Sequence, residues 1–178
     1  GTTNLDVVDI DGAVNMASTL TITGAINGAT IKADTTNFVN SYLISQDAGT
    51  GTLNSASNNT GFGDSVFAAL TTGDNNTGIG RESMLVNTTG ASNTALGSTS
   101  LDANTTGSFN TAIGQASLTA NTTAEENTAV GYSAAGATTT GAVNTAVGSQ
   151  ALADNTTGSS NVAIGREALH TNTTASDN

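Results

Sequence analysis

Few side chains in this sequence combine the types and spacing that chemistry requires. Asp9 and Asp11 alternate along an extended stretch, so their carboxylates fall on one side of a strand and could bind calcium. The other ligands of an EF-hand-type loop are missing, and a solvated acidic strand is the simpler interpretation. Glu125-Glu126 and His170 stand at variable positions of a repeated unit, which predicts solvent-facing side chains. No Ser-His-Asp set and no phosphate-binding loop is present, so we expect no enzyme, no cofactor and no metal site.

Asn-Thr-Thr triplets form a second candidate set, because they match the acceptor pattern for N-glycosylation. Ladders of stacked amides are the alternative, since the triplets recur with the repeat. Their threonines also allow an ice-binding surface, although adjacent threonines on a strand point to opposite faces and make a poor flat array. The triplets begin at Asn87, Asn104, Asn121, Asn155 and Asn172.

The elements that position these side chains are seven copies of a 17-residue unit over residues 59–177. The unit reads Asn-Thr-Ala-Φ-Gly, then a stretch with leucine at the ninth position and Asn-Thr-Thr-Gly from the twelfth, where Φ is a large apolar residue. A fixed short period predicts a solenoid whose coils stack on one another. Stacking predicts a ladder of the first-position asparagines, namely Asn59, Asn76, Asn93, Asn110, Asn127, Asn144 and Asn161.

Side chains alternate along the Asn-Thr-Ala-Φ-Gly strand, so Φ and Ala face opposite ways. We expect Φ to meet the ninth-position residue inside the coil, in a core of Phe62, Ile79, Leu96, Ile113, Val130, Val147, Ile164, Met84, Leu101, Leu118, Leu152 and Leu169. The third position is always Gly or Ala, which is typical of close approach to another surface. We therefore predict a subunit interface at Ala95, Ala112, Ala129, Ala146 and Ala163.

The rest of the chain divides into two segments. Residues 1–34 alternate apolar and polar side chains, which predicts a thin β-rich fibre shaft with one apolar face that needs partner chains. Residues 35–58 form a neck that could contain one short strand. Asn178 opens an eighth copy of the unit, so we expect the chain to be part of something longer, cut at a repeat boundary.

Composition limits the partners. The net charge of −11 argues against binding to nucleic acid or to an anionic membrane, both of which require a basic patch. Cysteine is absent and aromatic residues make up 3% of the chain, so neither a disulfide framework nor a thick globular core is expected. A solenoid with about two large side chains per coil gains little from its own core, and we expect a parallel homo-oligomer.

The recurring Asn-Thr-Ala-Ile-Gly core, as at residues 110–114, resembles the head repeats of trimeric autotransporter adhesins of the YadA type. The resemblance covers residues 59–178, although the repeat here is longer than in that family. It implies a left-handed parallel β-roll in a homotrimer. Residues 9–24 resemble shaft sequence of tailed-phage tail fibres, chiefly in composition.

Together these resemblances imply a structural or adhesive segment of an extracellular fibre, on a virion or a bacterial cell surface. Such a segment would space and present a host-binding or surface-binding tip, with any glycan or protein receptor bound by regions outside this chain. The alternative is a monomeric β-solenoid that binds ice or glycans through its Thr and Asn rows.

Overall fold

A computed structural model describes residues 30–35, 38–45 and 53–178. Residues 1–29, which contain Asp9, Asp11 and most of the predicted shaft, lie outside the described residues. The described part is all-β, with strands and turns and no helix. It accordingly holds no helix with the length and apolar character that crossing a membrane needs.

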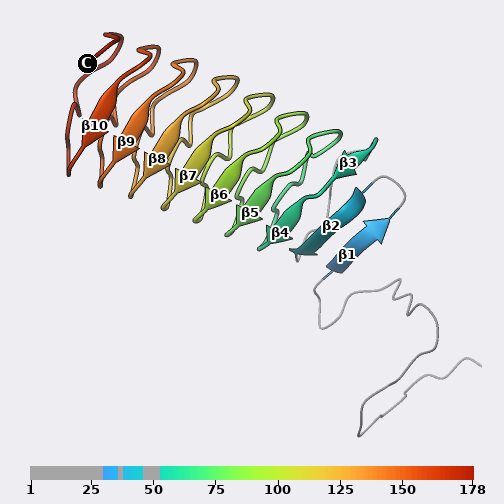
Figure 1. The fold of residues 1–178 in the computed structure, drawn as a ribbon. Helices are drawn as coiled ribbons and strands as arrows, with labels where there is room; N and C mark the ends of the chain where they lie inside the picture. Colours follow the sequence, from blue (N-terminus) through green and yellow to red (C-terminus); the bar gives the residue numbers. More distant parts are fainter. Residues whose placement is uncertain (1–29, 36–37, 46–52) are drawn as a thin grey trace, which may run out of the picture.

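Seven short parallel strands, one from each copy of the unit, stack side by side along a rod (Figure 1). Each strand pairs in register with the strand 17 residues further on, as in the pairing of Thr111 with Thr128. One unit therefore makes one coil, and the predicted parallel β-solenoid is confirmed. The strands are β4 (Thr60–Phe62), β5 (Thr77–Ile79), β6 (Thr94–Leu96), β7 (Thr111–Ile113), β8 (Thr128–Val130), β9 (Thr145–Val147) and β10 (Val162–Ile164).

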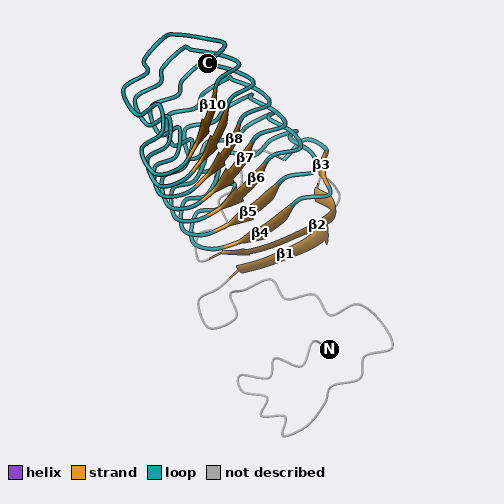
Figure 2. Cartoon of the chain, turned by 60° about the vertical axis from the view of Figure 1, so that its left-hand side comes forward, coloured by secondary structure: helices purple, strands orange, loops and turns teal. Residues whose placement is uncertain are grey.

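Turns complete each coil, and they stack as regularly as the strands (Figure 2). The backbone N–H of Thr88 donates to the carbonyl of Thr105 at 2.9 Å, and equivalent bonds join the other coils. The fifth-position glycine that ends each strand has φ between 117° and 143°, a region that L-residues rarely adopt. A Cβ added at Gly131 would lie 2.5 Å from the carbonyl oxygen of Gly148 in the next coil. Glycine is therefore required there by both conformation and space.

The predicted neck contributes an additional layer to the solenoid. Strand β2 (Phe38–Ser45) lies parallel to β4, with Leu43 opposite Gly61. Strand β1 (Thr30–Thr35) pairs antiparallel with β2 and so covers the first edge of the sheet, while β3 (Ala56–Ser57) also pairs with β2. The solenoid thus begins before the first recognisable repeat.

The interior of the solenoid is lined by the third and ninth positions of the unit. Met84, Leu101, Leu118 and Leu152 are fully buried, as predicted, whereas Leu169 in the last coil is 37% exposed. The predicted interface residues are buried inside the same chain, so their assignment to a subunit interface is wrong. These residues are Ala95, Ala112, Ala129, Ala146 and Ala163, each at most 1% exposed.

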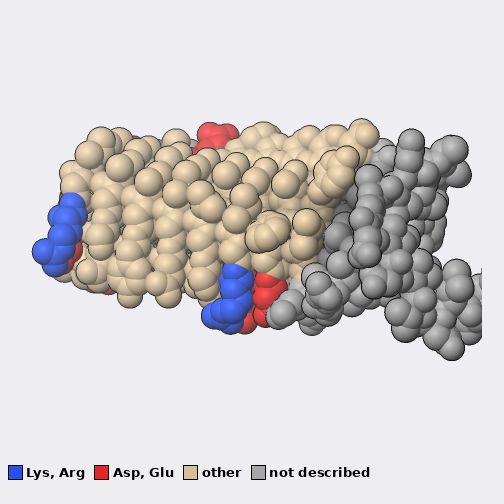
Figure 3. All heavy atoms as spheres, turned by 90° about the horizontal axis from the view of Figure 1, so that it is seen from below, with Lys and Arg blue, Asp and Glu red and all other residues tan. Residues whose placement is uncertain are grey.

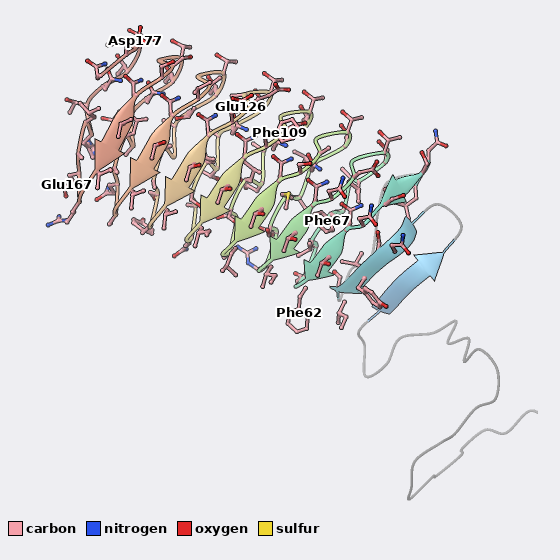
Figure 4. The ribbon with its side chains drawn as sticks, in the orientation of Figure 1. Phe62, Phe67, Phe109, Glu126, Glu167 and Asp177 are labelled. Atoms are coloured by element: carbon pink, nitrogen blue, oxygen red, sulfur yellow. The ribbon has the colours of Figure 1, made fainter. Side chains whose placement is uncertain are left out.

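The fourth-position residues point outward, so their assignment to the core is also wrong. Phe62 is 58% exposed and Ile164 is 69% exposed, and Figure 4 shows the Phe62 ring directed away from the coil. The strands confirm that second and fourth positions share a face and that the third lies opposite, but the small side chain faces inward. The outward residues are Phe62, Ile79, Leu96, Ile113, Val130, Val147 and Ile164, which are exposed or half-buried.

The thinness of the coil explains this reversal. Every ninth-position residue has positive φ, between 49° and 59°, and all of these residues except Leu169 are buried inside the coil. A Cβ added at Gly61 would lie 3.0 Å from Cδ2 of Phe67, so the opposing strand has room for only a small side chain. Left-handed backbone costs roughly 1–2 kcal/mol for a residue with a Cβ. Burial of a leucine side chain stabilises the fold by about 1.5–3 kcal/mol, which offsets this cost.

Candidate interaction face

The outward side of the strands is an unbroken face without charge. We call it the outer strand face, and it consists of the second-position and fourth-position side chains of the seven coils. The second positions are all threonine except Val162, and the fourth positions are all large and apolar. Tyr42 and Ile44 of β2 continue both columns, and both are exposed. A row of apolar side chains thus runs along one side of the rod, separated by β-sheet spacing of about 4.8 Å.

The first-position asparagines form the predicted ladder inside the coil, where they support the outer strand face. The backbone N–H of Asn76 donates to Oδ1 of Asn59 at 2.9 Å, and Nδ2 of Asn76 donates to the carbonyl of Gly90 at 2.9 Å. Each asparagine thereby joins its coil to the preceding coil and ties the strand to the turn beyond it. All seven are at most 1% exposed, so the Asn ladder is unavailable to an external ligand.

The Asn-Thr-Thr triplets supply a second internal ladder. Nδ2 of Asn104 donates to Oδ1 of Asn87 at 2.8 Å and to the carbonyl of Gly107 at 2.9 Å. Asn121 and Asn155 are likewise fully buried, so in the folded chain these amides are not presented to a modifying enzyme. The ladder interpretation of the triplets is therefore the one that the geometry supports.

The two threonines of each triplet have different environments. The first is half-buried in most coils, and its hydroxyl donates to the carbonyl of the equivalent threonine one coil on, as Thr88 does to Thr105 at 2.9 Å. The second is exposed in every coil, from Thr72 to Thr174. The outermost threonines therefore form a single column of hydroxyl and methyl groups at one-coil spacing.

The charged candidates lie on the surface and do not converge. Glu125 and Glu126 are exposed, and Nδ1 of His170 lies 3.4 Å from Oδ2 of Asp154. The guanidinium of Arg166 forms an ion pair with its sequence neighbour Glu167, at 2.5 Å. Figure 3 shows one side of the rod with wide uncharged stretches and a few isolated charged side chains. Among the described residues, no group of three His, Cys, Asp or Glu side chains is placed to hold a metal ion.

Comparison with protein-family models, with curated proteins and with solved structures found no match to this chain. Function is therefore inferred from the faces of the solenoid. The outer strand face is the one on which large apolar side chains recur in every coil, several of them exposed, and such a row of exposed apolar side chains marks an interaction site.

Proposed function

We propose that the chain is a structural or adhesive segment of an extracellular homotrimeric fibre, in which the outer strand faces of three parallel copies pack around a common axis. The carrying observation is the outward row of exposed and half-buried apolar side chains from Phe62 to Ile164. Half-covering seven such side chains would contribute on the order of 5–10 kcal/mol per chain. That is comparable with the roughly 4–15 kcal/mol that association costs in lost translation and rotation.

Charge favours a second copy of this chain as the occupant of the face. The chain carries a net charge of −11, yet the second and fourth positions of every unit are uncharged. Copies can therefore approach through this face while most of their acidic side chains stay in solvent, where salt screens them. The number three and the left-handed coil come from the resemblance to adhesin head repeats, which also supports the extracellular location.

The proposed role of the segment is mechanical. The described coils form a rod whose first-position asparagines are hydrogen-bonded from coil to coil, and such a rod transmits position and spacing along its length. A fibre segment of this kind would present a host-binding or surface-binding tip formed by regions outside this chain. Neither nucleic acid nor a membrane is a proposed partner.

Light scattering tests the proposal directly. We expect a mass three times that of one chain at micromolar concentration, and we expect the assembly to dissociate when Val130 and Val147 are both changed to Asp. The matched control is Thr123→Asp with Thr140→Asp, which adds the same charge to the exposed threonine column and should leave the trimer intact. A folded monomer of the unmodified chain would overturn the trimeric fibre.

The exposed threonine column favours one second candidate, a monomeric solenoid that binds ice or glycans. Its threonines are exposed to a ligand, whereas the first-position Asn ladder is internal. Thermal hysteresis of a monomeric sample that disappears in Thr106→Lys would favour ice binding. A trimer with no hysteresis would reject ice binding.

A further inference from the structure

Two columns of side chains border the outer strand face at opposite ends of its strands. Figure 4 shows Phe109 and Glu126 at the edge where strands begin, and Glu167 beyond the edge where they end. The column before the strands is the seventeenth position of the unit, and the column after them is the sixth. Each sixth-position residue stands at about the same height along the rod as the seventeenth-position residue that precedes its own coil.

Most residues of the two columns are small or polar, but three adjacent levels, from Phe109 to Val143, differ. In the sixth-position column the exposed aromatic residue is Tyr132, which is 53% exposed. At its height in the other column stands Glu126, which is exposed. One coil to either side of Glu126 stand Phe109 and Val143, which are 61% and 52% exposed. Glu126 is thus a carboxylate between two exposed apolar side chains.

In a ring of parallel copies around an axis, the end of a strand in one copy meets the start of the equivalent strand in the next. We infer that Tyr132 of one copy inserts between Phe109 and Val143 of its neighbour, where its phenol donates a hydrogen bond to the carboxylate of Glu126. This inference rests on the proposed trimer and names the contact that aligns its copies. A phenol ring with one polar tip fits a gap that is apolar on both sides and acidic at its centre.

Such a contact answers a problem that the repeat creates. Because every coil presents Thr and Φ at the same positions, two copies could slide by one coil and still match threonine with threonine and Φ with Φ. A slip of one coil between successive copies would replace a closed ring by an open helical assembly. Slippage would also place the ring of Tyr132 directly against Phe109 or Val143 and remove its acceptor. The pair Tyr132 and Glu126 therefore selects one register.

Disulfide trapping tests the register, because the chain contains no cysteine of its own. Ser92→Cys with Ser98→Cys joins neighbouring copies in the aligned register and leaves the Tyr132 contact unchanged. Asn75→Cys with Ser98→Cys joins them only after a slip of one coil. Within one chain, five extended residues separate Ser92 from Ser98, a span of roughly 15 Å or more, which exceeds the about 7 Å between Cα atoms that a disulfide allows.

We expect the aligned pair to give covalently linked trimers and the offset pair to give none. Adding Tyr132→Ser should reduce the aligned cross-link, while light scattering and circular dichroism still show an assembled, folded protein. Equal cross-linking of both pairs in a trimer, or an aligned cross-link that Tyr132→Ser leaves unchanged, would overturn the register contact and leave the trimer standing. A folded monomer would overturn the trimer and the contact together.

Discussion

Asn121 stands one coil before Thr138, and the Oδ1 atom of Asn121 is buried without a hydrogen-bond partner. Elsewhere in this ladder an asparagine one coil on supplies the donor, as Asn104 does for Asn87 and Asn121 does for Asn104. Thr138 interrupts the series, and Asn155 in the next coil reaches only its hydroxyl, at 3.4 Å. Because Thr138 stands where the other coils have asparagine, Oδ1 of Asn121 is left without a donor.

The substitution Thr138→Asn should therefore stabilise the solenoid. The new amide would donate both to Oδ1 of Asn121 and to the carbonyl of Gly141, as its equivalents do in neighbouring coils. We expect the free energy of unfolding to rise by about 1 kcal/mol, measured by urea denaturation at one protein concentration. Thr138→Val, which offers no donor, is the matched control and should give no gain. A loss of stability in Thr138→Asn would show that the coil has no room for the amide.

Substitutions at Leu118 and Ile113 should separate folding from assembly. Leu118 is fully buried, and a carboxylate there has no partner, so Leu118→Asp should cost more than about 4 kcal/mol and unfold the coil. Ile113 faces outward, so Ile113→Asp should keep the circular dichroism spectrum and lose assembly. Gln115→Asp, at an exposed turn, should leave the circular dichroism spectrum and the free energy of unfolding unchanged. If both aspartates unfolded the isolated chain equally, the outward direction of Ile113 would be contradicted.

The third position offers a test of the interior. Ala112 lies inside the coil, so Ala112→Leu should overpack it and destabilise the fold by roughly 1–3 kcal/mol in thermal or urea unfolding. The volume-conserving change Ile113→Leu on the outer strand face should have little effect on the same measurement. A variant Ala112→Leu with unchanged stability and lost assembly would instead return alanine to the subunit interface.

Much of the fold follows from the sequence because a fixed repeat length determines the length of one coil and which residues stack on one another. The 17-residue spacing predicts one unit per coil and stacked asparagines, and both are confirmed. Alternation predicts that Thr111 and Ile113 share a face. It does not predict which face is interior, and the assumption that larger apolar residues face inward fails here. Leu118 and the two Asn ladders already occupy the thin interior.

The first layer escaped prediction because it breaks the period. Residues 41–45 align with residues 59–63, but the spacing is 18 residues and asparagine is replaced by Ser41. The hydroxyl of Ser41 nevertheless accepts the N–H of Asn59 at 2.8 Å, in the place of the usual amide oxygen. The residues of the outer strand face could be predicted to lie on one side of the strands. Their exposure could not be predicted, since alternation does not show which side of the strands faces the interior.

The packing of Leu43 against Gly61 of the first coil provides the last prediction. A Cβ added at Gly61 would lie 2.6 Å from Cδ1 of Leu43 and 3.0 Å from Cδ2 of Phe67, so Gly61→Ala should cost roughly 1–3 kcal/mol. Leu43→Ala alone should cost about 2–5 kcal/mol through the cavity that it leaves. The double variant should be more stable than the two losses added together, by about 1 kcal/mol, because the new methyl occupies part of that cavity. Phe67 limits how much stability the new methyl group restores.

Equilibrium urea unfolding of the four proteins measures this coupling, and Gly61→Ala combined with Leu118→Ala, several coils away, is the control that should be additive. Strict additivity of the Leu43 and Gly61 changes would mean that β2 does not pack on β4 through Leu43.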